Sequence, residues 1–271
     1  MPMYNFNSLQ NISLEQLADC FNLAFSDYEQ PIHFTTDSLK YYLTASRVDL
    51  SLSFGAFCRE QLVGFILNSS GIYHGQAVVF DAGTGVIPEH RGKQVFSGLF
   101  AYTAEQLRDQ KIKRYYLEVL QENHHAVSIY RKKGFSILRE YSVLVASGFE
   151  GAKNPQVAAL PYGDFQTFET TFSVEPSFEH TMDAIQQNPQ LYEVLYLPGQ
   201  AYCIHAKRNG ELIQLHYHNL EALKDVLSVL AGKYPSAMAK NIDYKYPDVI
   251  NVLQEIGFKE ITKQYEMVRD L

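Results

Sequence analysis

The sequence has no tryptophan, only three cysteines and no long apolar segment among its 271 residues. The lack of tryptophan leaves the aromatic part of any core to 19 tyrosines and 17 phenylalanines. Cys20, Cys58 and Cys203 are odd in number and far apart, which excludes a disulfide framework and a cysteine metal site and indicates reduced thiols. No segment approaches the roughly 18 apolar residues of a membrane-spanning helix, and residues 1–10 lack the basic and apolar regions of a signal peptide. We therefore expect a cytoplasmic protein with no membrane partner.

Basic residues are also scarce, with 23 Lys and Arg against 30 Asp and Glu, and the formal net charge is -7. A nucleic-acid-binding domain usually carries a basic patch, so we expect no nucleic-acid partner. The composition, 46% hydrophobic and 20% charged residues, is that of a globular protein rather than a disordered one. The length fits one large domain or two of ordinary size.

The first half of the chain alternates between helical and extended patterns. Apolar residues with helical spacing, preceded by Ser13 and Gln16 as a capping box, predict a helix over residues 13–28. The other predicted elements of this half are a helix that begins near Thr36, a hairpin over 52–67, a strand over 76–87, a helix over 92–110, a strand over 112–120, a helix over 126–133 and a strand over 136–146. This order predicts a mixed α+β domain.

A second series of elements follows a segment rich in turn-forming residues. It comprises a hairpin of 201–207 and 211–217, a helix over 219–231, a strand near 238–242, a helix over 247–256 and a strand over 261–268. Its Gly257–Phe258 pair repeats the Gly134–Phe135 pair of the first half. We therefore predict a first domain over residues 1–146, a linker over 147–163 and a second, diverged copy over 164–271.

The segment that follows the strand over 76–87 predicts an anion site. Pro88 stops the strand, and Arg91–Gly92 leads directly into a helix. The first N–H groups of a helix have no intrahelical partner and lie at the positive end of the helix dipole, so they can hold a phosphate. Gly92 allows a close approach of the backbone, and Arg91 and Lys93 add positive charge.

Other phosphate-binding loops fit this segment less well. A P-loop needs Ser or Thr after its Lys, whereas Gln94 follows Lys93. A dinucleotide fingerprint needs Gly three residues after Gly85, where the chain has Pro88. The simpler alternative is that Arg91–Gly92 is an ordinary helix start with surface charges.

A second motif opens the helix over 126–133. Asn123 is a good N-cap, and Asn123, Ala126 and Tyr130 are spaced so that they share one helical face. Gly134 fits the left-handed conformation that ends many helices. A packing role for Tyr130, in a chain with 19 tyrosines, is the alternative to a functional one.

Together the two segments resemble the cofactor motifs of the GNAT superfamily of N-acyltransferases. Residues 86–96 look like the loop that binds the acetyl-CoA pyrophosphate, and residues 123–135 match Asn-x-x-Ala-x-x-x-Tyr-x-x-x-Gly-Phe at every spacing. The resemblance at the level of motifs covers about residues 50–146, and the order of elements extends it to the N-terminus. It implies an α+β fold, a GNAT-like mixed sheet flanked by helices, followed by a second diverged GNAT-like domain. It also implies an acetyltransferase that moves an acetyl group from acetyl-CoA to a primary amine by direct attack.

The same resemblance implies which residues bind the cofactor. Backbone N–H groups of residues 92–96 would hold the pyrophosphate with Arg91 beside it, and the backbone of Val86 and Ile87 would pair with the pantetheine arm. Asn123 would contact the pantetheine or the nearby backbone. The complete implied set is Val86, Ile87, Arg91, Gly92, Lys93, Gln94, Val95, Phe96 and Asn123.

For the chemistry, the resemblance implies that Tyr130 protonates the leaving thiolate. Asp81 and Glu118 lie on strands beside the expected site, and either could accept the proton of the amine. A solvated or cap-bonded carboxylate is the alternative for each. No spacing of histidine, cysteine and acidic residues predicts a metal ligand set, so we expect no metal.

Two departures from the family pattern bear on function. Gln94 replaces a usual Gly, and Phe96 replaces a common small residue and could narrow the loop. Gln94 favours the alternative function, an acyl-CoA-binding sensor or scaffold without turnover, whereas the presence of Tyr130 favours an enzyme.

The second copy lacks the chemistry of the first. Leu253 and Tyr246 occupy the positions of Tyr130 and Asn123, and His218–Asn219 replaces the Arg-Gly turn. We therefore expect a cofactor-free domain that shapes the acceptor site or an interface. The acceptor is expected to be a small-molecule or peptide amine, the acidic net charge is compatible with a cationic one, and a homo-oligomer is compatible with the sequence.

Overall fold

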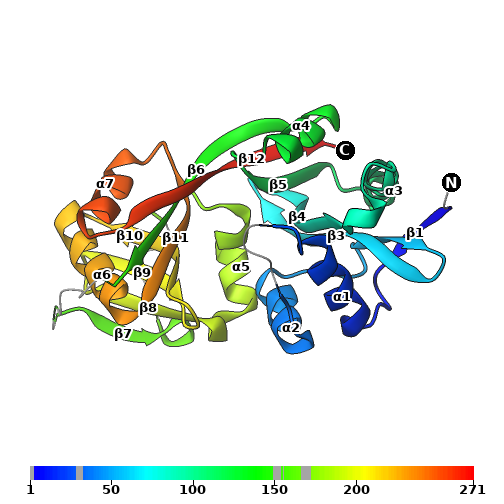
Figure 1. The fold of residues 1–271 in the computed structure, drawn as a ribbon. Helices are drawn as coiled ribbons and strands as arrows, with labels where there is room; N and C mark the ends of the chain where they lie inside the picture. Colours follow the sequence, from blue (N-terminus) through cyan, green and yellow to red (C-terminus); the bar gives the residue numbers. More distant parts are fainter. Residues whose placement is uncertain (1–2, 29–32, 149–153, 155, 166–171) are drawn as a thin grey trace. The chain divides into compact units, whose positions relative to one another are not determined.

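The computed structural model describes residues 3–28, 33–148, 154, 156–165 and 172–271, and it contains two compact units (Figure 1). The first unit consists of Met1–Leu117 together with Val268–Leu271, and the second consists of Glu118–Met267. Both units combine helices with strands, so the predicted α+β class is confirmed.

The first unit has the strand order β1-β2-β3-β4-β5, followed by the end of β12. The strands up to β4 are antiparallel neighbours, and β4 pairs in parallel with β5 from Val78↔Arg114 to Asp81↔Leu117. Figure 1 shows α1 and α2 on one side of these strands and α3 on the other. The elements are β1 (Tyr4–Ser8), α1 (Leu14–Ala24), α2 (Thr36–Ala45), β2 (Phe54–Cys58), β3 (Gln61–Tyr73), β4 (Gln76–Val86), η1 (Pro88–His90), α3 (Val95–Asp109) and β5 (Arg114–Leu120), whose last residues belong to the second unit.

Short-range signals in the sequence fix the starts of the first two helices. The Ser13 side chain accepts a hydrogen bond from the Gln16 N–H at 3.1 Å, and Thr35 and Ser38 form a reciprocal capping box. α1 ends at Ala24, four residues before the predicted end. Its apolar face is buried, and the Phe21 ring stacks on Phe65 of β3 with centroids 5.0 Å apart.

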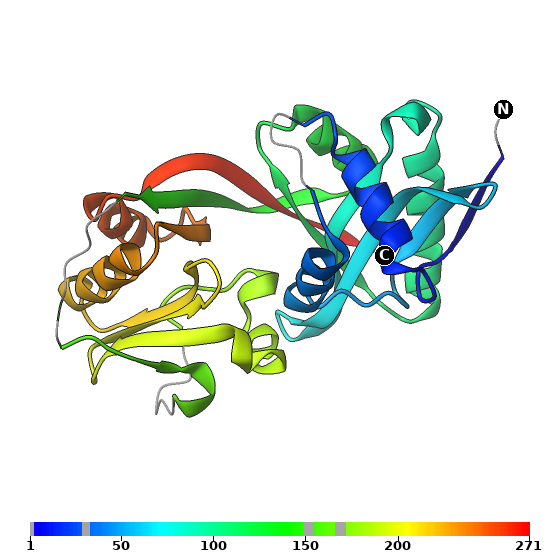
Figure 2. The same cartoon turned by 60° about the horizontal axis from the view of Figure 1, so that its bottom comes forward.

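The second unit holds the strand order β12-β6-β11-β10-β9-β8-β7. Residues on alternate positions of β8–β10 enter two different cores, as the two-residue period of a strand requires. Cys203 lies in the core that contains α6, whereas Tyr202 and Ile204 lie in the core on the other face. Figure 2 shows α6 and α7 over one face of these strands. The elements are α4 (His124–Lys132), β6 (Ser136–Ser147), β7 (Ala158–Pro161), η2 (Tyr162–Asp164), η3 (Phe178–His180), α5 (Met182–Gln187), η4 (Pro189–Leu191), β8 (Tyr192–Leu197), β9 (Ala201–Ala206), β10 (Glu211–Tyr217), α6 (Leu220–Lys233), β11 (Ser236–Asp243), α7 (Pro247–Glu255) and β12 (Lys259–Asp270).

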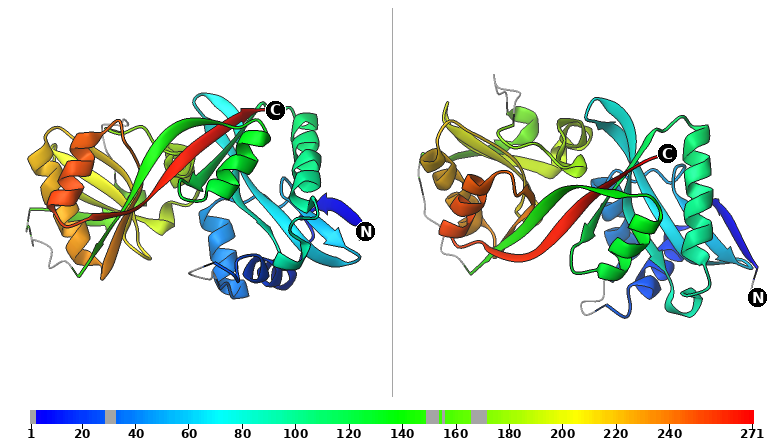
Figure 3. Two further views of the ribbon diagram at one scale, coloured as in Figure 1. Left: turned by 45° about the horizontal axis from the view of Figure 1, so that its top comes forward. Right: turned by 90° about the horizontal axis from the view of Figure 1, so that it is seen from above.

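The two halves of the sequence exchange their closing strands. β6, the last strand of the predicted first domain, pairs antiparallel with β11 in the second unit. The end of β12 instead belongs to the first unit, where the Leu271 N–H donates to the Lys113 carbonyl at 2.9 Å and Asp270 pairs with Arg114 at 3.2 Å. Figure 3 shows β6 and β12 as long neighbouring ribbons. The compact units therefore do not coincide with the sequence repeat, and the boundaries at 146 and 163 stay predictions about that repeat.

The repeat itself is visible in two helix ends. Asn123 and Tyr246 are the N-cap residues of α4 and α7. Gly134 and Gly257 have φ angles of 89° and 94°. The Phe135 N–H donates to the carbonyl of Tyr130 at 3.1 Å, and the Phe258 N–H donates to that of Leu253 at 3.0 Å. Both helices thus end in the same Schellman arrangement, in the frame that the sequence predicts.

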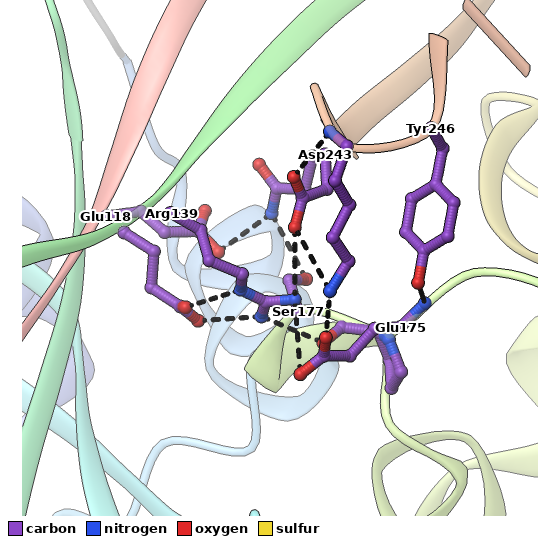
Figure 4. Close-up of polar contacts among 10 residues, drawn as sticks. Glu118, Arg139, Glu175, Ser177, Asp243 and Tyr246 are labelled. Atoms are coloured by element: carbon purple, nitrogen blue, oxygen red, sulfur yellow. Dashed lines mark hydrogen bonds and ion pairs between the residues drawn. The ribbon is translucent and has the colours of Figure 1, made fainter. Parts of the chain in front are cut away.

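A buried ion pair joins the two exchanged strands. Arg139 of β6 donates to Glu266 of β12 through Nε at 2.7 Å and through Nη2 at 3.1 Å, and it also donates to the Pro176 carbonyl. The Glu266 side chain has no exposed surface and that of Arg139 is 8% exposed. Figure 4 shows Glu175 and Asp243 directed toward the same guanidinium.

Replacement of Arg139 with Met should therefore destabilise the protein strongly, because the Glu266 carboxylate would stay buried without its guanidinium. We expect a loss of about 3–5 kcal/mol in the free energy of unfolding, measured by urea denaturation. Lys224→Met, which breaks the exposed pair with Glu255, is the matched control and should cost no more than about 1 kcal/mol. Equal losses in the two variants would contradict a structural role for the buried pair.

Candidate active site

The predicted phosphate turn is built from two residues in the left-handed region. After η1, Gly92 has φ 71° and Gln94 has φ 64°, and α3 begins at Val95 rather than at Gly92. A Cβ added to Gly92 would meet no atom within 4 Å, so backbone conformation rather than space favours glycine there. Gln94 is thus not helical, and its left-handed conformation costs about 1–2 kcal/mol relative to an ordinary backbone position.

The first turn of α3 is open to an anion. Gln94 is the N-cap, but its side chain makes no capping hydrogen bond, and the first turn contains no acidic residue. The first helical bond runs from the Gly98 N–H to the Gln94 carbonyl at 3.0 Å. The N-terminal end of this helix therefore combines a positive dipole with N–H groups that no side chain of the cap covers.

Arg91 holds this turn against the end of α1. Its guanidinium donates to Asp27 through two nitrogens, at 2.5 and 3.0 Å, and to the Ala24 carbonyl at 2.6 Å. Its Nε donates to the Val86 carbonyl at 2.9 Å. Hydrogen bonding from Arg91 lowers the pKa of the Asp27 carboxyl. Asp27 is a residue that sequence reasoning missed, because nothing in the local pattern near α1 indicates a partner 64 positions away.

A second contact restrains the same turn from β1. The Tyr4 hydroxyl and the His90 Nδ1 are 2.9 Å apart, and their rings meet edge to face. Further along, a Cβ at Gly98 would lie 2.6 Å from the Phe6 ring, so this glycine lets β1 approach α3 closely. The turn is therefore held by β1 and by α1.

The other predicted cofactor residues lie around this turn. Val86 pairs with Gly64 at the end of β4, and the Ile87 N–H donates to the Val63 carbonyl at 3.0 Å. Lys93 is exposed, Val95 is buried, and the Phe96 ring lies 5.8 Å from that of Phe100. The structure thus brings residues 86–96 together in one strand–turn–helix segment of the first unit, and their contacts with a cofactor stay predictions.

The second motif lies in the second unit, where two of its residues have structural partners. The Asn123 side chain caps α4 by accepting from the Ala126 N–H at 3.0 Å. The partly buried Tyr130 ring meets Phe135 edge to face, with centroids 5.6 Å apart, as the hydrophobic contact of the Schellman end. Because this contact uses the ring, the hydroxyl of Tyr130 is not explained by it.

Asp81 stabilises an irregularity in β4. The pairing of β3 and β4 shifts between Leu67↔Gly83 and Asn68↔Asp81, which leaves Ala82 as an extra residue. Asp81 accepts from the Gly83 N–H at 3.0 Å through one oxygen and from the Thr84 hydroxyl at 2.7 Å through the other. Both oxygens of Asp81 therefore accept from groups of the same strand, which fits the alternative of a locally bonded carboxylate.

Glu118, the other candidate proton acceptor, is buried among polar groups from other parts of the chain. Its side chain is 5% exposed, lies 3.5 Å from the Lys240 ammonium and accepts from the Asn241 amide at 2.8 Å. Burial raises the pKa of the Glu118 carboxyl above its ordinary value, while Lys240 and Asn241 act against this rise. Sequence reasoning missed Lys240 and Asn241, which lie more than a hundred residues away in the chain.

The helix that follows the second hairpin differs from α3 at its N-terminus. Asn219 caps α6 by accepting from the Ala222 N–H at 2.8 Å, and Glu221 lies in the first turn. A side chain therefore already occupies the cap, and a carboxylate adds negative charge where a phosphate would bind. The absence of a cofactor from the second copy stays a prediction, which the occupied cap and Glu221 favour.

Two hollows of about 470 and 480 Å³ lie beside α4 in the second unit. Both are lined by His124, Val127 and Arg131, and neither is lined by Asn123 or Tyr130.

Within the described residues, no group of three or more His, Cys, Asp or Glu side chains is arranged to hold a metal ion. None of the helices described combines the length and the apolar character needed to cross a membrane.

Comparison with known proteins adds a family and a set of similar folds. The model of the acetyltransferase (GNAT) family matches residues 14–135, and no curated protein sequence matches the chain. The fold is similar to that of a GCN5-related N-acetyltransferase from Sphaerobacter thermophilus, with a TM-score of 0.69 and 10% identity over 98% of this chain and 95% of that one. A GCN5-related N-acetyltransferase from Anabaena variabilis has a TM-score of 0.58 and 14% identity over 98% of this chain and 72% of that one.

A third similar structure is the glucosamine N-acetyltransferase region of a fungal multi-domain β-N-acetylglucosaminidase. Its TM-score is 0.71 and its identity 12%, over 98% of this chain and 38% of that one. At such identities these likenesses establish the fold alone. They do so over nearly the whole chain, which confirms a GNAT-like mixed sheet flanked by helices.

The contacts of Arg91 lead to a prediction that separates two roles for its charge. If Arg91 acts by holding the turn to Asp27, then Arg91→Ala and Asp27→Ala should each weaken acetyl-CoA binding by about fivefold, the equivalent of about 1 kcal/mol. The double variant should bind no more weakly than either single one, because the two residues act through one contact. Calorimetry on the full-length protein measures all three affinities.

The control for these three variants is the exposed pair of Arg114 and Asp270. Loss of this pair should leave the affinity for acetyl-CoA unchanged. A direct contact between Arg91 and a phosphate would give a different pattern. In that case only Arg91→Ala would weaken binding, and Asp27→Ala would preserve or improve it.

Proposed function

We propose that the protein transfers an acetyl group from acetyl-CoA to a primary amine, because the model of the acetyltransferase (GNAT) family matches residues 14–135. The amine nitrogen attacks the thioester carbonyl directly, a C–N bond forms, and the C–S bond breaks to release the thiol of CoA. The reaction needs proximity of the two substrates, an acceptor for the amine proton and a donor for the thiolate.

The observation that carries this proposal is the uncapped N-terminus of α3. The turn at Gly92 and Gln94 presents helix N–H groups with no acidic residue in the first turn, which suits the pyrophosphate of acetyl-CoA. The corresponding helix of the second copy, α6, is capped by Asn219 and carries Glu221. One cofactor per chain, bound at α3, is the stoichiometry that this difference supports.

The alternative of an acyl-CoA sensor without turnover depends on Gln94. Since Gln94 adopts the left-handed conformation that the turn requires, its presence does not abolish the turn. The departure from glycine thus gives less support to the alternative than the sequence alone does. Release of free thiol from acetyl-CoA, with a panel of amines, separates the two functions.

The acceptor is proposed as a cationic small-molecule or peptide amine. The net charge of -7 favours the approach of a cation over that of an anion. A suitable panel contains a polyamine, an aminoglycoside, a lysine peptide and glucosamine, the last because it is the substrate in the name of one similar structure. Thiol release with one class and not the others would identify the acceptor.

Cofactor binding is tested by reversing one charge at the turn. Lys93 is exposed beside the first turn of α3, so Lys93→Glu should repel the pyrophosphate and weaken acetyl-CoA binding by roughly tenfold. Lys113→Glu makes the same change in net charge at another exposed position of the first unit and should leave binding unchanged. Calorimetry requires the full-length protein, since the end of β12 is part of the first unit. No binding of acetyl-CoA or other acyl-CoAs by the unaltered protein would exclude the proposed function.

The chemical role of Tyr130 is tested by Tyr130→Phe. The variant keeps the ring that packs on Phe135 and loses only the hydroxyl. If the hydroxyl protonates the leaving thiolate, turnover should fall by roughly 10²-fold or more, while affinity for acetyl-CoA should change little. Steady-state thiol release and calorimetry provide the two measurements. Unchanged turnover would mean that Tyr130 serves only to pack the end of α4.

A further inference from the structure

A β-bulge in β11 brings two adjacent polar side chains to one carboxylate. The pairing with β6 runs from Ala239↔Leu144 to Ile242↔Ser142, so β11 has one extra residue, and Lys240 and Asn241 share the bulge. Asn241 has φ 60°, a left-handed conformation that asparagine tolerates better than most residues. In a regular strand, two successive side chains would point to opposite faces.

Here both side chains reach Glu118. The Asn241 Nδ2 donates to one Glu118 oxygen at 2.8 Å and to the Ser177 hydroxyl at 3.2 Å, while the Lys240 ammonium lies 3.5 Å from the other oxygen. Asn241 is 6% exposed, so this amide is fixed inside the protein. Figure 4 shows Glu118 and Ser177 within the same polar cluster.

The charges around Glu118 oppose one another. Lys240 of β11 is shared with Glu179 of η3, which it contacts at 2.7 Å. Glu179 and Glu266 of β12 are the nearby carboxylates that disfavour the charged form of Glu118, and Lys240 is the cation that favours it. Glu211 of β10 also faces Lys240, and its negative charge raises the pKa of the ammonium and so favours the charged form.

We propose that Lys240 and Asn241 are positioning residues, which the bulge supplies from the second copy to hold Glu118 as the proton acceptor for the incoming amine. This proposal rests on the proposed acetyl transfer. It gives the second copy a part in the reaction without a cofactor of its own.

The proposed step accounts for every proton. An alkylammonium acceptor gives one proton to the Glu118 carboxylate and becomes the neutral amine. Its lone pair forms the C–N bond as the C–S bond breaks, and the second proton lost by nitrogen balances the one that the thiolate gains. The products are the acetylated amine, CoA with a free thiol, and a protonated Glu118 that returns its proton to solvent.

The test is the dependence of kcat/KM on pH for the unaltered protein and three variants, with one amine throughout. Lys240→Gln removes the cation, which should raise the pKa of Glu118 and move the acid limb of the profile up by about one pH unit. Glu179→Gln removes a like charge and leaves Lys240 to Glu118, which should move the same limb down. Asn241→Ala should move it up, because the hydrogen bond to the charged form is lost.

Lys224→Gln is the matched control, since it neutralises a lysine in an exposed pair of the same unit and should leave the profile unchanged. Opposite displacements in the Lys240 and Glu179 variants support the proposal. The proposal is overturned if the variants release thiol but the acid limb does not move, or if it moves in the same direction in Lys240→Gln and Glu179→Gln. Full kcat/KM in Glu118→Gln would also overturn it. If one of the three variants does not fold, the other two still show whether the acid limb moves in the expected direction. No thiol release by the unaltered protein with any amine would instead overturn the proposed function, and this proposal with it.

Discussion

The ion pair between Arg139 and Glu266 joins the two strands on which the rest of the structure depends. Glu266 has no exposed surface, so its charge is tolerable only while the guanidinium of the neighbouring strand accompanies it. The pair links β6 to β12, and these are the strands that the two halves exchange. β12 lies next to β5 of the first half, and β6 lies next to β11 of the second half. Each half of the sequence thus supplies a strand to the sheet of the other.

At the phosphate turn, the backbone conformation is maintained by contacts rather than by sequence alone. Gln94 adopts a left-handed backbone conformation that is unfavourable for glutamine and accessible to glycine without steric cost. Arg91 stabilises the turn through hydrogen bonds to Asp27 and to the Ala24 carbonyl, and the hydrogen bond between His90 and Tyr4 stabilises it from β1. Strain of this kind persists where the surrounding structure determines the conformation, as it commonly does at ligand sites. The protein's own contacts thus hold the conformation of the turn, which would spare a bound anion the free energy of ordering it.

The sequence predicts local features well and distant partners poorly. Most helices and strands of the two GNAT-like copies were expected, including α4 and α7 with their glycine ends. The strands β1, β7 and β8 and the helix α5 were not expected. For β1 the reason is that its partner β2 lies beyond α1 and α2 in the chain, so its own sequence does not indicate the pairing. For the same reason the motif indicates Arg91 but not Asp27, and the strand indicates Glu118 but not Asn241. Strand exchange has no local signature, since β12 has the same pattern whichever sheet edge it joins.

The comparison of the two copies explains how one could lose its cofactor chemistry and still be retained. α6 has a cap and a carboxylate where α3 has an open turn, and Leu253 stands where Tyr130 provides a hydroxyl. The cap and the carboxylate make the N-terminus of α6 less suited to a phosphate, while the packing frame of helix, glycine and phenylalanine is the same in both copies. β11 meanwhile carries a bulge whose two polar side chains converge on a buried carboxylate of β5. A buried Asn and Glu with a partly buried Lys are poorer in packing energy than apolar side chains of similar size, so stability alone does not account for them. Under the proposed mechanism these side chains hold Glu118 in place, and this is the part that the second copy would take in the reaction.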